Sequence, residues 1–129
     1  MKILRDSRTI AVVGCSRDHA KAAHTVPKYL QEHGYRIIPV NPIAEEILGE
    51  RAYSCLSDIK VPIDIVDIFR PSSETYGIVA EAVKLKPKLI WLQLGILDES
   101  ARKLSESNGI HYVEDRCIKL EHQRLLRVG

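Results

Sequence analysis

Short apolar segments alternate with segments of helical periodicity along the chain, and this alternation most constrains the fold. The expected strands cover residues 10–13, 36–40, 63–69, 89–92 and 112–113. The expected helices cover roughly residues 23–33, 72–85, 98–107 and 116–127. Strands that alternate with helices form a parallel sheet with right-handed crossovers. We therefore predict an α/β fold, a doubly wound, Rossmann-like sheet of five parallel strands in the order 3-2-1-4-5.

Local signals mark the ends of several elements. Pro27 is tolerated only in the first turn of its helix, because further in it would remove a backbone donor. Gly34 is the expected end of that helix. A hydroxyl cap is expected where residues 71–74 open the next helix, and Asp98 is the expected cap of the following one. Residues 41–62 are predicted to be irregular, with a turn at residues 48–50 and a short helical turn near residues 56–59.

Length and charge narrow the range of partners. A chain of 129 residues is expected to form one domain, residues 1–129, that folds without disulfides or metal. Nineteen Lys and Arg against 17 Asp and Glu give a net charge of +2, too small to indicate nucleic acid or an anionic membrane. A small-molecule ligand is therefore expected, while a protein partner or a homo-oligomer stays open.

The cellular location is predicted from what the sequence lacks. The N-terminal residues are charged, without the apolar core of a signal peptide, and no apolar run reaches the roughly 20 residues of a membrane span. The three cysteines form no C-x-x-C pair, so neither a zinc site nor a disulfide framework is indicated. We expect a cytoplasmic protein with reduced thiols and no metal.

The first strand end suggests a phosphate site. Ligands of doubly wound sheets bind at the carboxyl ends of strands, at a switch point that the expected order places between strands 1 and 4. Gly14 ends strand 1, where a glycine lets a phosphate approach the backbone. Ser16 adds a hydroxyl, and Arg17 and Lys21 add positive charge. The same residues are equally consistent with a tight turn and a solvated basic loop.

The second strand end argues against nicotinamide dinucleotides. Asn41 and Pro42 stand where NAD-binding domains place an acidic residue that accepts from the ribose hydroxyls. Asn accepts only weakly, and Pro has no N–H to donate. Glu45 and Glu46 follow, and two carboxylates would repel the 2′-phosphate of NADP. Another adenine nucleotide is therefore favoured.

The third and fourth strand ends offer further ligand-binding groups. Arg70 can pair with a phosphate, and Phe69 and Pro71 can form the walls of an adenine pocket. The alternative interpretation makes Arg70 a surface cation and Phe69 a core residue. Gln93 offers a side-chain amide, and Gly95 permits close backbone approach. The sequence contains no G-x-S-x-G, H-E-x-x-H or phosphate-loop lysine motif, so no catalytic residue is assigned.

A set of short motifs, in order along nearly the whole chain, carries a resemblance to a known family. The motifs are Ala11–Ser16, Tyr29–Tyr35, Pro39–Pro42, Ile47–Gly49, Asp67–Pro71, Trp91–Gly95 and Asp115–Lys119. With them the chain resembles the small stand-alone CoA-binding proteins, which are similar to the CoA-binding domain of the succinyl-CoA synthetase α-subunit. The resemblance implies a Rossmann-type domain that binds coenzyme A, or a short acyl-CoA, at the strand ends.

By position, the resemblance also implies the ligand-binding residues. The loop after strand 1 would face the phosphates or pantetheine, the ends of strands 2 and 3 the adenosine and nucleotide, and the end of strand 4 the pantetheine. The implied residues are Gly14, Cys15, Ser16, Arg17, Lys21, Val40, Asn41, Pro42, Phe69, Arg70, Pro71, Gln93, Leu94 and Gly95.

Three functions remain open on the sequence alone. The first is non-catalytic CoA binding, favoured because the synthetase domain with a phosphorylated histidine has no counterpart in these residues. The second is an NAD(P)-dependent reductase or an acyl-CoA-handling enzyme, for which His19 and His24 are the acid–base candidates. The third is a regulatory protein that responds to CoA. Cys15, beside the implied pantetheine path, is a candidate for a mixed disulfide with CoA.

Overall fold

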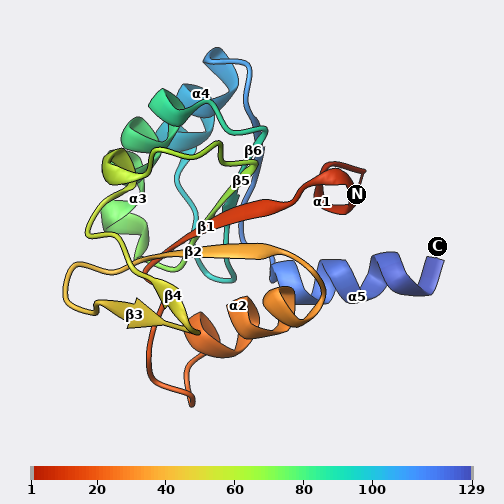
Figure 1. The fold of residues 1–129 in the computed structure, drawn as a ribbon. Coiled ribbons are helices and arrows are strands. Elements are labelled where there is room, and N and C mark those ends of the chain that lie inside the picture. Colours follow the sequence, from red (N-terminus) through yellow and green to blue (C-terminus); the bar gives the residue numbers. More distant parts are fainter. Residues whose placement is uncertain (1, 129) are drawn as a thin grey trace.

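The computed structural model describes residues 2–128 as a parallel sheet with helices on both faces (Figure 1). The strands of this five-stranded sheet are β1 (Thr9–Val13), β2 (Arg36–Val40), β5 (Ile65–Ile68), β6 (Leu89–Leu92) and β7 (His111–Val113). The α-helices are α1 (Lys2–Asp6), α2 (Ala22–Glu32), α3 (Ser72–Ala82), α4 (Glu99–Ser107) and α5 (Ile118–Val128). The predicted α/β, Rossmann-like fold class is confirmed.

The strand order differs from the prediction. The observed order is β2-β1-β5-β6-β7, so the third main strand, β5, lies next to β1 and not at an edge. All four residues of β5 are buried, as expected of a strand covered on both faces. Strand β2 is instead one of the two edge strands of the main sheet, and it contains Pro39, a residue that edge strands tolerate. The predicted order 3-2-1-4-5 is therefore wrong, although Pro39 was a signal that could have corrected it.

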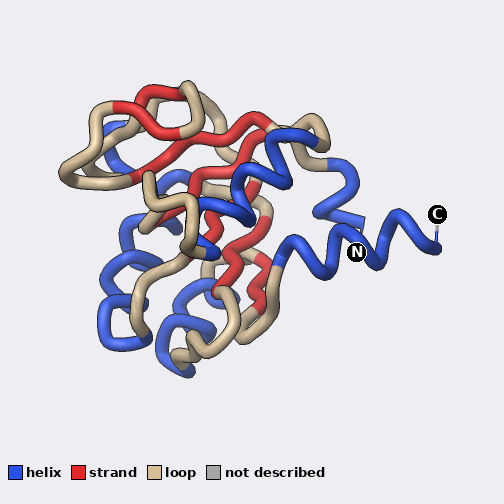
Figure 2. Tube along the Cα trace, turned by 90° about the horizontal axis from the view of Figure 1, so that it is seen from below, coloured by secondary structure: helices blue, strands red, loops and turns tan. Residues whose placement is uncertain are grey.

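Apolar residues of the sheet point alternately into two cores. Figure 2 shows the helices on either side of the strands that cover these cores. Ala11 and Val13 belong to the core beneath α3 and α4. Ile10 and Val12 belong to the core beneath α1, α2 and α5. This alternation follows from the two-residue period of a strand, and it means that both faces of β1 are dry.

The region between β2 and β5 contains the predicted turn and the predicted short helical turn, and it adds a pair of strands that was not predicted. A two-stranded hairpin of β3 (Glu46–Ile47) and β4 (Glu50–Arg51) is followed by the short 3₁₀ helix η1 (Leu56–Asp58). Tyr53 extends the edge of the main sheet, because its N–H donates to the carbonyl of Pro39 at 2.9 Å. A second 3₁₀ helix, η2 (Val83–Leu85), continues α3.

The local helix signals gave mixed results. Gly34 follows α2 with φ +94°, and the Asp98 side chain accepts the N–H of Ala101, so both predicted helix ends are confirmed. The predicted hydroxyl cap of α3 is wrong: the N-cap is Pro71, and the Ser72 hydroxyl instead accepts the N–H of Leu97. Pro27 lies inside α2, beyond its first turn, also contrary to prediction.

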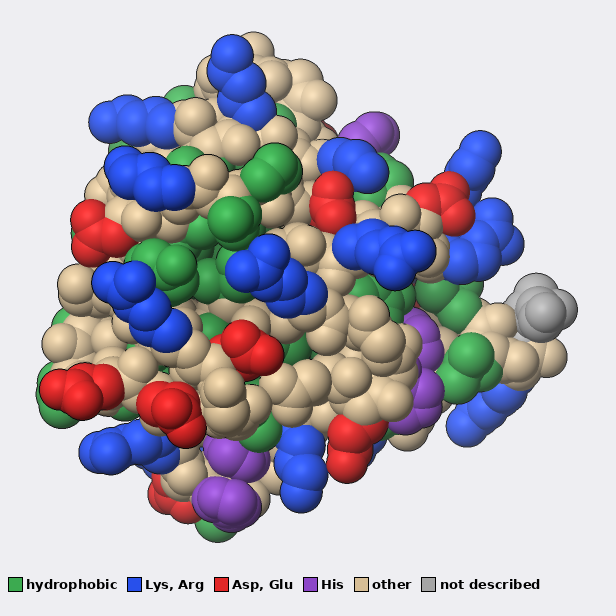
Figure 3. All heavy atoms as spheres, viewed as in Figure 1, with side chains coloured by type: hydrophobic (Ala, Val, Ile, Leu, Met, Phe, Trp, Pro, Cys, Tyr) green, Lys and Arg blue, Asp and Glu red, His purple; other side chains and the backbone are tan. Residues whose placement is uncertain are grey.

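The described residues contain no membrane-spanning helix, and one face of the molecule carries charges of both signs. No helix within residues 2–128 is both long and apolar enough to cross a membrane. On the face shown in Figure 3, the blue Lys and Arg side chains are interspersed with the red Asp and Glu side chains. On this face the charges therefore mark no extended basic or acidic surface.

One carboxyl group lies in the dry interior. Asp67 of β5 is fully buried and neither of its oxygens has a hydrogen-bond partner. Burial raises the pKa of Asp67 well above its ordinary value. Asp64, just before β5, behaves oppositely: partial burial works against its charge, but the N–H groups of Arg8 and Thr9 and the ammonium of Lys88 outweigh it and lower its pKa.

These opposite shifts predict opposite pH effects on stability. The folded state holds a proton on Asp67 that the unfolded chain releases, so this group stabilises below the ordinary Asp value of 3.8 and that stabilisation is lost as the pH rises toward the raised pKa. We expect Asp67→Asn to flatten this decline of the free energy of unfolding with rising pH. Asp64 stabilises above its unfolded pKa, so Asp64→Asn should lose stability at neutral pH. Urea unfolding between about pH 2 and 8 covers both slopes, because the Asp64 contribution is lost only as the pH falls below the ordinary Asp value. If Asp67→Asn kept the wild-type loss of stability with rising pH, Asp67 would not be the cause of that loss.

Candidate functional site

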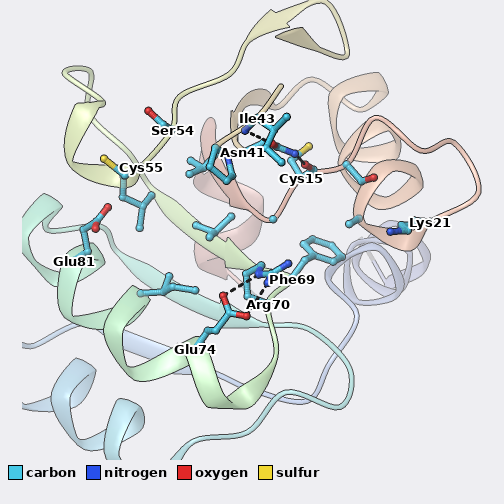
Figure 4. A pocket seen from close by; sticks show the side chains of 18 residues that line it. Cys15, Lys21, Asn41, Ile43, Ser54, Cys55, Phe69, Arg70, Glu74 and Glu81 are labelled. Carbon is cyan, nitrogen blue, oxygen red and sulfur yellow. Dashed lines mark hydrogen bonds and ion pairs between the residues drawn. The ribbon is translucent and has the colours of Figure 1, made fainter. Parts of the chain in front are cut away.

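A cavity of about 600 Å³ opens where β1, β2 and β5 end (Figure 4). Lys21 and Phe69 lie on one side of this cavity, and Ser54, Cys55 and Glu81 lie on the opposite side. The order of the strands explains the position, because the chain leaves β1 toward β2 on one side and returns to β5 on the other. The switch point is thus between β1 and β5, and not between the first and fourth main strands as predicted.

Most of the predicted site residues meet in this cavity. Those that line it are Gly14, Cys15, Ser16, Lys21, Val40, Asn41, Pro42, Phe69 and Arg70. Those that do not are Arg17, Pro71, Gln93, Leu94 and Gly95. The last three follow β6, which is separated from β1 by β5. Gln93 is buried and accepts the N–H of Ile118, while the N–H of Gly95 donates to Asp115, so these groups hold the neighbouring loop together.

The cavity also has walls that the sequence did not reveal. They come from the last residue of β1, from the start of α2, from the segment between β2 and β5, and from one face of α3. The added residues are Val13, Ala23, Ile43, Ser54, Cys55, Leu56, Glu74, Ile78 and Glu81. The spacing of Glu74, Ile78 and Glu81 marks one face of a helix, which was a usable signal. For the residues around η1, the sequence contains no signal that they line the cavity, because their position depends on the crossover between strands.

Asn41 holds two loops together. Its Nδ2 donates to the carbonyl of Cys15 at 3.0 Å, and its Oδ1 accepts the N–H groups of Ile43 (2.8 Å) and Ala44 (3.0 Å). The backbone N–H of Gly14 adds a bond to the carbonyl of Val40 at 3.0 Å. An aspartate at position 41 could not donate to Cys15. The lack of an acidic residue at this strand end therefore has a structural cause as well as a bearing on the ligand.

Gly14 is required by the residues that pack on it. Its φ is +84°, in the left-handed region that favours glycine. A Cβ at this position would lie 2.9 Å from Cδ of Arg70 and 3.1 Å from the carbonyl oxygen of Phe69. The Arg70 stem thus lies across the glycine. The close approach that the sequence suggested for a phosphate is made by this side chain in the structure.

Two cations line the cavity, and among the described residues only one of them, Arg70, has an ion-pair partner. The guanidinium of Arg70 donates to both carboxylate oxygens of Glu74, from Nη2 at 2.7 Å and from Nε at 3.1 Å. This hydrogen-bonded pair raises the pKa of Arg70 and lowers that of Glu74. Within residues 2–128, Lys21 makes no ion pair. An anionic ligand would therefore meet one free ammonium and one guanidinium whose charge is already shared.

Neither of the sequence's reactive candidates is placed for chemistry. Cys15 is fully buried, and burial, with a smaller contribution from Asp67, raises the pKa of its thiol to about 12. The thiolate that disulfide exchange requires is therefore scarce. His19 and His24 stack on each other at 4.1 Å, and neither lines the cavity. His24 instead bonds through Nδ1 to the carbonyl of Ser16 at 2.7 Å.

Fold and site together place the protein in the Rossmann-like class: a parallel sheet, a glycine turn after β1 and a cavity at the strand ends, where such sheets hold their ligands. The family described as "CoA binding domain" matches residues 8–123, and the chain belongs to this family. The expected kinship with CoA-binding proteins is thereby confirmed.

Known proteins of similar size share nearly the whole chain. "Uncharacterized protein YneT" of Bacillus subtilis is 40% identical over 121 residues, which cover 94% of this chain and 90% of that protein. The structure of "cell-free ID.343" from Thermus thermophilus matches with a TM-score of 0.92 and 45% identity, over 96% of this chain and 94% of the other.

A larger enzyme shares a part of the chain. An ADP-forming acetate–CoA ligase of Methanocaldococcus jannaschii is 26% identical over 84 residues, which cover 65% of this chain but only 12% of the ligase. The similarity thus concerns a small part of that enzyme.

The role of Asn41 can be tested by stability. Asn41→Asp should lower the free energy of unfolding by about 1–3 kcal/mol, because the carbonyl of Cys15 loses its donor. Asn108→Asp is the control: it removes a bond from Nδ2 to the carbonyl of Leu104, but at an exposed site where water replaces the donor. Denaturant unfolding compares the two variants. Equal losses would contradict a special role for Asn41.

Proposed function

We propose that this protein binds coenzyme A, free or as a short acyl-CoA, in the cavity at the ends of β1, β2 and β5. The observation that carries the proposal is the position of this cavity at the switch point of the sheet, in a chain of the CoA-binding domain family. Rossmann-like sheets bind nucleotides at this place because the strand ends leave a crevice there, with backbone groups at its edge.

The cavity offers different chemistry at its two sides. On the side of α2, the ammonium of Lys21 and the guanidinium of Arg70 suit the phosphates of CoA. On the other side, Leu56 and Ile78 offer apolar surface for the adenine ring. Glu81 has one oxygen engaged by the N–H of Ser57 and a second that could accept from the adenine amino group. We assign the phosphates to the first side and the base to the second.

The proposal is one of binding without catalysis by this chain. The titratable groups that line the cavity are Lys21, Arg70, Glu74, Glu81 and the thiols of two cysteines. Arg70 and Glu74 neutralise each other, and the histidines that could act as acid or base lie elsewhere. The ligase activity of the acetate–CoA ligase belongs to a much longer protein. These arrangements favour a ligand-binding role over an NAD(P)-dependent reductase or an acyl-CoA-handling enzyme.

Calorimetry with CoA, dephospho-CoA, NAD and NADP tests the ligand. We expect CoA to bind, dephospho-CoA to bind less tightly, and NAD and NADP to bind weakly or not at all.

Lys21→Ala and Arg70→Ala should each weaken CoA binding by about tenfold or more, since each removes a charged contact. Lys28→Ala, which changes an exposed lysine of α2 outside the cavity, should leave the affinity for CoA unchanged. Binding of NAD without CoA would refute the proposal.

A substitution of Glu74 should strengthen CoA binding, whereas the substitutions of Lys21 and Arg70 should weaken it. Its carboxylate competes with a ligand phosphate for the Arg70 guanidinium and also repels that phosphate. Glu74→Gln should therefore tighten CoA binding by about threefold or more, and most strongly at low ionic strength. Titrations at low and high salt measure the effect. Weaker binding in this variant would mean that Glu74 orients Arg70 for the ligand instead of competing with it.

A further inference from the structure

An unusual residue lies within α2, behind the loop that follows β1. Pro27 is buried and sits inside the helix, past the first turn. In a regular α-helix, the N–H of residue 27 would donate to the carbonyl of Ala23. Proline has no N–H, and its ring also pushes against that carbonyl. The carbonyl of Ala23 therefore lacks its normal partner within the helix.

That carbonyl is used by the loop. The N–H of Ser16 donates to the carbonyl of Ala23 at 3.1 Å. One residue further along α2, Nδ1 of His24 bonds to the carbonyl of Ser16 at 2.7 Å. Both backbone polar groups of Ser16 are thus tied to the first turn of α2. Ser16 and Ala23 also both line the cavity, so these bonds set its shape on the side of Lys21.

We propose that Pro27 is a positioning residue for the ligand-binding loop: by keeping the Ala23 carbonyl free of the helix, it holds Ser16 in place. The effect of Pro27 on CoA affinity rests on the proposed function, whereas its effect on the Ser16 loop does not. The bonds of Asn41 to Cys15 and of Gly14 to Val40 hold the rest of the loop. The loop is therefore ordered before the ligand arrives, which lowers the entropy lost on binding.

The arrangement also decides which groups of Ser16 face a ligand. Its N–H is occupied by Ala23, so it does not serve as a phosphate donor. Its hydroxyl oxygen already accepts the N–H of Asp18 at 3.0 Å and keeps its own hydrogen to donate. Ser16 thus offers a hydroxyl hydrogen, and Pro27 fixes where that hydrogen can point by fixing the backbone.

The test replaces Pro27 by a residue of similar bulk that has an N–H. In Pro27→Val, the new N–H competes with Ser16 for the Ala23 carbonyl. Hydrogen exchange by NMR, without ligand, should show the Ser16 amide exchanging about tenfold faster relative to the amides of β1. CoA should bind about three- to tenfold more weakly, the range expected for one hydrogen bond. Pro27→Ala serves as a second variant if valine does not fit.

Val26→Ala is the matched control. It truncates a neighbouring buried side chain of α2 while leaving Pro27 in place. We expect it to reduce stability but to preserve both Ser16 protection and CoA affinity. Unchanged Ser16 exchange in Pro27→Val, or equal effects in both variants, would overturn the positioning role. Failure of the wild-type protein to bind CoA would instead overturn the proposed function, and the ligand-free exchange still reports on Pro27.

Discussion

The pairing of β1 with β5 is the constraint on which the site depends. It places the turn at Gly14 beside the end of β5, so that the stem of Arg70 lies across the glycine and its guanidinium reaches the cavity. It also moves β6 one strand away from β1. With β5 at an edge, the Arg70 side chain would start two strands from Gly14, and the same residues would form a different site.

The loops at this edge are held by directed hydrogen bonds more than by apolar packing. Asn41 joins the ends of β1 and β2, and the carbonyl of Ala23 joins Ser16 to α2. These bonds satisfy polar groups that the sheet and helix would otherwise leave without partners. Because the backbone N–H groups of Gly14 and Ser16 already donate to other carbonyls, side chains such as Lys21 are left as the main donors to a ligand. The site resembles a preformed crevice lined by a few charged groups.

Electrostatics at the site is local, since the chain as a whole is nearly neutral. Lys21 is free of ion pairs within the described residues, whereas Arg70 shares its charge with Glu74. The cavity therefore attracts anions moderately, and the carboxylates of α3 limit how much negative charge it accepts. Such a balance suits a ligand that combines phosphates with apolar and neutral parts. Asp67 is buried in β5, and its raised pKa favours the neutral form.

The sequence by itself determined the elements and most of the residues at the strand ends. Periodicity located β1, β2 and β6, and cap chemistry located the ends at Gly34 and Asp98, because these signals depend on neighbours within a few residues. Gly14, Asn41 and Arg70 were found because each ends a strand of a parallel sheet. Only the tertiary structure decided that β5 lies beside β1, that Glu81 and Leu56 line the cavity, and that Pro27 frees a carbonyl for Ser16. These facts depend on contacts between segments distant in sequence, and local pattern carries no information about which segments meet.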